Sequence, residues 1–199
     1  MKNILILSVA ILLSLNVFSQ KDSVKVNSIS FSSGQGALSS GPLLSADFSK
    51  GKDLINISLG ERDIYVVYLK NIYKDFYSGP SLEFYHNIPT VGLMSSVNFF
   101  NSKTLSVSML NWIGFSAGKP GYKADFTNWQ LLFFYQSLAL NYQRLSLSSA
   151  VLWYESWGYL FDLKYTQPLT ENFSAFGSAG YNFYEDGNYL FSIGLKYNF

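Results

Sequence analysis

The chain has 199 residues, of which 18% are aromatic and only 14% are charged, and it contains no cysteine. The charged fraction is roughly half of that in an average soluble protein, which disfavours an ordinary cytosolic enzyme. Without cysteine, neither a disulfide scaffold nor a thiolate metal site can form. A formal net charge of +1 gives nucleic acid no electrostatic reason to bind.

The first residues have the pattern of an export signal. Lys2 precedes a nearly unbroken apolar run from Ile4 to Leu15, which is shorter than the roughly 20 residues that a transmembrane helix needs. This pattern predicts a cleaved secretory signal peptide over residues 1–19, with Gln20 as the mature N-terminus. A structural N-terminal helix is the alternative, although the run has no polar face. Residues 20–199 are then expected to form one domain.

After the leader, apolar residues recur at every second position. The alternation is clearest at the end of the chain, where one face carries Tyr189, Phe191, Ile193, Leu195, Tyr197 and Phe199, and the other carries Ser192, Gly194, Lys196 and Asn198. A period of two is that of a β-strand. Turn-forming residues interrupt the pattern repeatedly, so we expect an all-β chain of many antiparallel strands.

Segments between turn signals give up to twelve candidate strands. The stretch 53–70 could be one strand instead of two, and Pro80 could interrupt the fifth segment because proline donates no backbone hydrogen bond. Eight or ten strands therefore remain alternatives. The candidates lie at residues 24–33, 42–50, 53–60, 63–70, 76–86, 90–100, 104–117, 126–142, 144–155, 157–167, 172–184 and 188–199.

Two kinds of barrel or sandwich satisfy this alternation. A soluble one points its apolar face inward, whereas a transmembrane one points it toward lipid. The polar face is rich in Ser, Gly, Asn and Thr, which suits an enclosed lumen better than an aqueous surface. Aromatic residues also recur at predicted strand ends, as in the girdles of membrane barrels. These residues are Tyr68, Tyr73, Tyr77, Trp112, Trp129, Trp153, Trp157, Tyr184, Tyr189 and Tyr197.

The C-terminus also favours the membrane. Ile193, Leu195, Tyr197 and Phe199 alternate up to a terminal aromatic residue. This ending resembles the carboxy-terminal signature of small Gram-negative outer-membrane β-barrel proteins. The resemblance is to that broad class and covers only the end of the chain. It implies recognition by the barrel-assembly machinery, residence in the outer membrane, and contact with outer-membrane lipid and lipopolysaccharide.

The links between strands provide a check on this assignment. If Phe199 ends at the periplasm, successive links must alternate between the two sides of the membrane. Counting backward then places 34–41 and 117–127, the two longest links, on the extracellular side. Longer extracellular loops are the rule in outer-membrane barrels. We therefore expect a single antiparallel up-and-down transmembrane β-barrel of about twelve strands.

The only histidine, His86, is predicted at the outer rim. Some outer-membrane barrels modify lipid A with a rim histidine and a serine, whose hydroxyl must lie within hydrogen-bond reach of the base. Ser81 and Glu83 point away from His86 on the same strand, whereas Ser95 or Ser96 on the next strand could approach it. His86 is thus a candidate catalytic residue, and an interfacial histidine is the simpler interpretation.

Charged residues within the predicted strands are expected to face the lumen, because a charge at the bilayer midplane costs about 2–4 kcal/mol. Such residues could form a paired network that fills a narrow barrel, or they could act as a selectivity filter. No residue spacing predicts a metal site or a cofactor site. The expected lumen-lining charges are Glu83, Asp162, Lys164 and Lys196.

These observations predict an integral outer-membrane barrel with a structural or narrow-pore, porin-like role. Two alternatives stay open. The first is a barrel enzyme that acts on lipid A through His86. The second is a soluble periplasmic β-barrel that binds a small apolar ligand.

Overall fold

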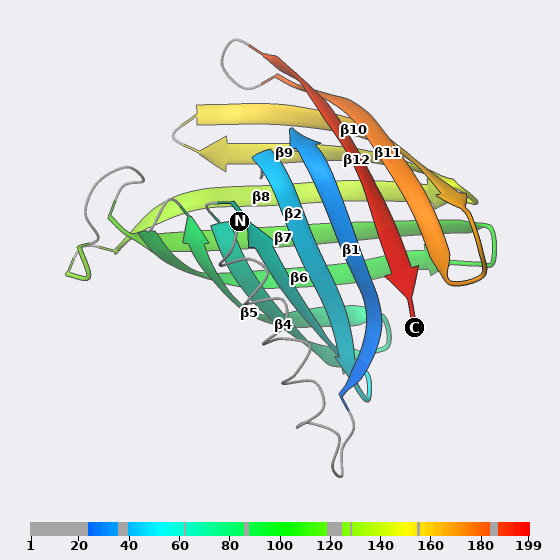
Figure 1. The fold of residues 1–199 in the computed structure, drawn as a ribbon. Coiled ribbons are helices and arrows are strands. Elements are labelled where there is room, and N and C mark those ends of the chain that lie inside the picture. Colours follow the sequence, from blue (N-terminus) through cyan, green and yellow to red (C-terminus); the bar gives the residue numbers. More distant parts are fainter. Residues whose placement is uncertain are drawn as a thin grey trace.

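The computed structural model describes residues 24–35, 40–61, 63–85, 88–118, 125–127, 129–154, 156–183 and 187–199. They form one closed barrel of antiparallel strands, in which every strand pairs with its sequence neighbours and the first pairs with the last (Figure 1). The predicted signal peptide lies outside the described residues. Within them, no helix is long and apolar enough to cross a membrane.

The prediction of a twelve-stranded up-and-down barrel is confirmed. The stretch around 53–70 forms two strands, and the strand that contains Pro80 is continuous. The strands are β1 (Lys25–Gln35), β2 (Ser40–Lys50), β3 (Asp53–Gly60), β4 (Asp63–Tyr73), β5 (Phe76–Tyr85), β6 (Ile88–Asn101), β7 (Leu105–Ala117), β8 (Trp129–Tyr142), β9 (Leu145–Tyr154), β10 (Ser156–Pro168), β11 (Phe173–Asn182) and β12 (Asn188–Asn198).

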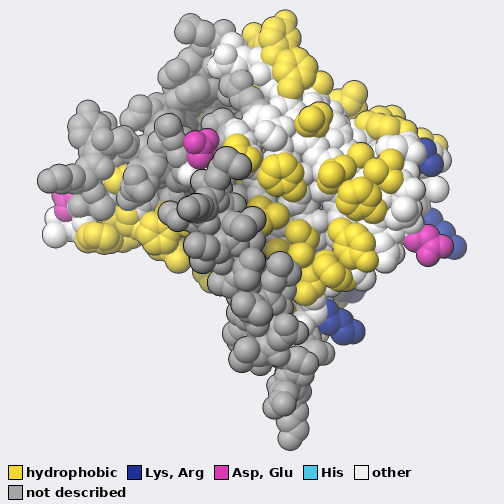
Figure 2. All heavy atoms as spheres, viewed as in Figure 1, with side chains coloured by type: hydrophobic (Ala, Val, Ile, Leu, Met, Phe, Trp, Pro, Cys, Tyr) yellow, Lys and Arg dark blue, Asp and Glu magenta, His cyan; other side chains and the backbone are white. Residues whose placement is uncertain are grey.

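The apolar face of the strands points outward. On β12, Phe191 and Ile193 expose 59% and 72% of their surfaces, whereas Leu190 in the opposite phase is buried. Figure 2 shows apolar side chains over the viewed face around β10–β12, with Lys and Arg side chains at its edge. An apolar surface of this extent would drive aggregation in water. The wall is therefore suited to lipid, as in transmembrane barrels.

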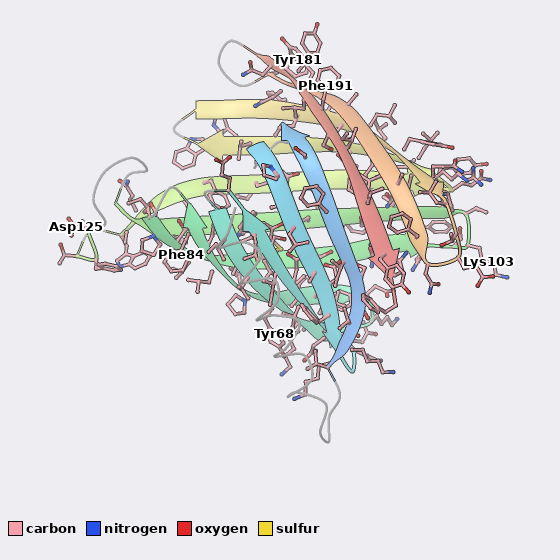
Figure 3. The ribbon with its side chains drawn as sticks, viewed as in Figure 1. Tyr68, Phe84, Lys103, Asp125, Tyr181 and Phe191 are labelled. Atoms are coloured by element: carbon pink, nitrogen blue, oxygen red, sulfur yellow. The ribbon has the colours of Figure 1, made fainter. Side chains whose placement is uncertain are left out.

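The two ends of the barrel carry links of different length. One end, which also holds the C-terminus, has the links 51–52, 74–75, 102–104, 143–144 and 169–172. The other end has the longest link, 118–128. Because periplasmic turns are short and extracellular loops are longer in outer-membrane barrels, we assign the first end to the periplasmic side. Lys103 lies at this end and Asp125 at the opposite one (Figure 3).

Several of the expected girdle residues lie on the outer wall near strand ends. Trp157 and Tyr189 expose 61% and 69% of their surfaces toward the extracellular end. Near the periplasmic end, the hydroxyl of Tyr68 donates a hydrogen bond of 2.6 Å to the carboxylate of Asp53. These residues combine an apolar ring with a polar group, which suits the boundary between lipid and water.

Trp112 is a correction to the predicted girdle. It is only 6% exposed and faces the lumen, because it lies in the middle of β7 and in phase with Gly114 and Ser116. Tyr77 likewise lies in phase with the inward Ser81 on β5. Tyr184 lies outside the described residues.

Candidate functional site: the lumen

The extracellular half of the lumen, which also holds the buried polar residues Glu83 and Thr90, contains eight apolar side chains that pack together. Each of them lies in the extracellular half of its strand, and none exposes more than 9% of its surface. Water therefore does not reach these side chains. We call this group the lumenal apolar cluster, which consists of Val67, Met94, Trp112, Phe133, Ala150, Leu152, Leu160 and Leu190.

Trp112 on β7 contacts residues of three other strands. Its indole N–H donates a hydrogen bond of 2.8 Å to the hydroxyl of Ser81 on β5. Its ring meets the edge of Phe133 at a centroid distance of 4.7 Å, and Tyr65 on β4 lies 6.2 Å away. Buried aromatic rings in such edge-to-face contacts hold one another in a defined orientation. Trp112 is therefore the central side chain of the cluster.

Two facing glycines make room for these rings. Gly92 on β6 pairs in register with Gly114 on β7. A Cβ atom at Gly92 would lie 2.5 Å from the Ser81 hydroxyl and 3.0 Å from the Trp112 indole nitrogen, and one at Gly114 would lie 2.5 Å from the Phe133 ring. Because these glycines have no side chain, the rings of Trp112 and Phe133 can lie directly against the inner face of the sheet at this point.

The wall formed by β1–β3 is polar and internally hydrogen-bonded. The carboxylate of Asp47 accepts hydrogen bonds of 2.7 Å from both Ser28 and Asn56. Ser58 donates to Asn56 at 3.0 Å, and the hydroxyls of Ser45 and Ser58 are 2.7 Å apart. Charge-assisted hydrogen bonds of this kind compensate the partial burial of a carboxylate.

The wall formed by β10–β12 carries cations in the periplasmic half. The ammonium of Lys164 lies 3.9 Å from the centroid of the Phe176 ring, a cation–π contact. Lys164 pairs in register with Ser178, and Lys196 with Ser174. Lys164 and Lys196 therefore both face the periplasmic half of the lumen.

The predicted lumen charges all lie on the inward rows. Asp162, Lys164 and Lys196 are half-buried on β10 and β12. Glu83 is buried on β5, opposite β11 in the ring of strands, and pairs in register with Tyr65 and Thr90. The structure thus separates Glu83 from the other three. Ile193, Leu195, Tyr197 and Phe199 are exposed on the outer wall, and their role as an assembly signal stays a prediction.

The candidate catalytic residue His86 lies outside the described residues. The serines considered with it lie far along the adjacent strand. Ser95 is seven residues from Ile88, where β6 begins, which corresponds to about 23 Å at roughly 3.3 Å per residue. Ser95 and Ser96 are thus remote from the end of the barrel at which β5 ends and β6 begins.

Sequence reasoning missed the lumenal apolar cluster and the Asp47 network. Trp112 gave a usable signal, since it is in phase with Gly114 and Ser116 and out of phase with the outward Phe115. The meeting of Trp112 with Tyr65 and Ser81 had no signal, because it depends on how the sheet closes. Among the residues that the structure describes, no His, Cys, Asp or Glu side chains gather in a group suited to a metal ion.

No protein-family model matches the chain, and no curated protein matches it. Among solved structures, the NanC porin covers 87% of this chain and 100% of its own, with a TM-score of 0.56 at 9% sequence identity. The chain shares the barrel fold of this porin. The KdgM porin covers 87% of this chain and 99% of its own, with a TM-score of 0.49 at 10% identity. A loop-deletion mutant of OmpT, an outer membrane protein of Vibrio cholerae, covers 83% of this chain and 66% of its own, with a TM-score of 0.41.

Proposed function

We propose that the chain is a narrow channel of the outer membrane that the lumenal apolar cluster holds closed. The porin fold and the apolar outer wall support the membrane location. The observation that carries the proposal is the change of lining along the lumen, from hydroxyls, amides and charges to the apolar residues packed around Trp112. Apolar constrictions of this kind gate channels by excluding water.

The position of the lysines supports transport over a purely structural role. Two cations on the same wall repel each other, and their partial burial carries a further desolvation cost. A barrel that served only as a scaffold has no need for cations on this wall. In a channel, these ammonium groups attract and guide solutes, which accounts for their presence.

The polar half suits small hydrophilic solutes. It offers hydroxyl groups, carboxylates and ammonium groups, whereas the only N–H or O–H group among the side chains of the lumenal apolar cluster is the indole N–H of Trp112, which already donates to Ser81. A solute that enters from the periplasmic side therefore meets a polar chamber that ends at an apolar barrier. Opening requires Trp112 and its neighbours to move aside or to be wetted.

Planar-bilayer recordings of the refolded protein test this function. Trp112→Ala removes the central ring of the cluster, so we expect the single-channel conductance to rise severalfold above that of the wild type. Trp157→Ala is the matched control, because Trp157 is exposed on the outer wall and should leave conductance unchanged. Silent bilayers for both the wild type and Trp112→Ala, with protein correctly inserted, would contradict the channel.

A further inference from the structure

A row of neutral polar side chains interrupts the apolar outer wall at β6–β8. Ser95, Asn111 and Gln136 stand opposite one another in register on three neighbouring strands. They lie in the opposite phase to the inward Met94, Trp112 and Tyr135, which are their chain neighbours. We call these three residues the amide row.

The amide row lies at the depth of the hydrocarbon core. Each member stands at the middle of its strand, with Asn111 at the centre of β7 (Leu105–Ala117). Exposed apolar residues flank the row toward both ends of the barrel, with Leu93 56% and Leu138 51% exposed. Lipid headgroups and water are therefore too far away to solvate these groups.

The hydrogen bonds within the row leave it incompletely satisfied. The side-chain N–H₂ of Gln136 donates to the Asn111 carbonyl at 2.7 Å and to the sulfur of Met109 at 3.7 Å. Asn111 donates to the Ser95 hydroxyl across a long 3.5 Å. In the described part of the chain, the Gln136 carbonyl oxygen accepts no hydrogen bond. An unsatisfied amide in hydrocarbon is costly, so a partner within the bilayer is favoured.

The chemistry of the amide row indicates which kind of partner can bind it. The row is uncharged and offers both donors and acceptors, and it lies where only a membrane-embedded protein can reach it. A second copy of the same chain carries identical amides at identical depth. Rotation about a two-fold axis along the membrane normal makes such a surface complementary to itself. The short Ser95 side chain beside the amides allows the two walls to approach closely.

We propose that two copies of this chain associate in the membrane through the amide rows on β6–β8. In the dimer, Gln136 and Asn111 of each copy exchange amide hydrogen bonds with those of the other. The lumens stay separate, so the association does not depend on the proposed channel activity.

Cysteine cross-linking in vesicles tests the contact directly, because the natural chain has no cysteine. The Gln136→Cys variant, reconstituted at low protein-to-lipid ratio and oxidised, should give a cross-linked dimer in high yield. The matched control is Leu163→Cys on β10, which is 49% exposed on another part of the outer wall and should give little dimer. Equal yields from the two variants would overturn the proposed interface.

Energy transfer between labelled copies, measured during dilution with lipid, tests the role of the amides. Each hydrogen bond between proteins in a membrane is worth about a threefold change in association constant. The double variant Asn111→Leu and Gln136→Leu should thus weaken association by roughly tenfold or more, while heat-modifiable gel migration confirms that the barrel still folds. Unchanged association, a monomeric wild type at every dilution, or a different membrane protein bound at the row would each overturn the proposal.

Discussion

At the scale of single residues, the face of the strand on which a residue lies decides whether its side chain points to the lumen or to the lipid. Trp112 and Trp157 have the same chemistry, yet Trp112 is 6% exposed in the lumen and Trp157 is 61% exposed on the outer wall. Successive side chains of a strand point to opposite faces. A substitution at either position therefore probes a different property, closure of the lumen for Trp112 and anchoring at the membrane interface for Trp157.

Lys164 sets the charge of the periplasmic half of the lumen. We expect Lys164→Glu to raise the permeability of cations relative to anions severalfold, because a negative group then replaces the ammonium beside Lys196. Lys164→Arg keeps the positive charge and can keep the contact with Phe176, so it should retain the selectivity of the wild type. Reversal potentials in a salt gradient measure the ratio. The same reversal potential for the Lys164→Glu and Lys164→Arg variants would show that position 164 does not face the conducting path.

At the scale of strands and hairpins, the β6–β7 pair explains how the cluster is held. Gly92 and Gly114 lie opposite each other at the level of Trp112, and larger residues there would occupy the space of the rings. The sequence shows two glycines in strands, which ordinarily weaken a strand. The structure shows that their small size is what allows the cluster to form.

Gly92→Ala should therefore destabilise the barrel. Its Cβ would meet the backbone oxygen of Ile113 at 2.5 Å as well as the Ser81 hydroxyl, and overpacking of this kind costs about 1–3 kcal/mol. Gly177→Ala on β11 is the control, since its Cβ would find only an oxygen at 3.8 Å. Urea unfolding in lipid vesicles measures both. A free energy of unfolding lowered equally by the two substitutions would show that loss of glycine, and not crowding of the cluster, is responsible.

The position of each strand was predictable from the sequence to within a few residues at each end. Alternation and turn residues located all twelve strands, because both depend on local chemistry. The strand ends differ where cross-strand pairing decides them: β4 continues to Tyr73, and β8 begins at Trp129 instead of residue 126. A register shift between Gly114 and Phe115 lies opposite Leu131 and Phe133, in a part of β8 where successive residues are apolar and alternation therefore does not mark the faces.

At the scale of the whole molecule, closure of the sheet creates properties that no strand has alone. The sequence predicted that charges face inward, but it could not predict which of them meet. Closure places Glu83 on β5 across the ring from Lys164 and Lys196, and it brings Tyr65 on β4 to Trp112 on β7. Contacts across the lumen join residues of high sequence separation, so local periodicity contains no information about them.

The central claim is that the apolar rows contact lipid while the alternate rows are enclosed. Spin labels attached at Ile193→Cys and Ser192→Cys in reconstituted vesicles test it most directly, because these neighbours lie on opposite faces of β12. The account predicts high accessibility to oxygen and low accessibility to a water-soluble nickel chelate at position 193, with much lower oxygen accessibility at position 192. The reverse pattern, with the label at 192 in lipid and that at 193 enclosed, would contradict it.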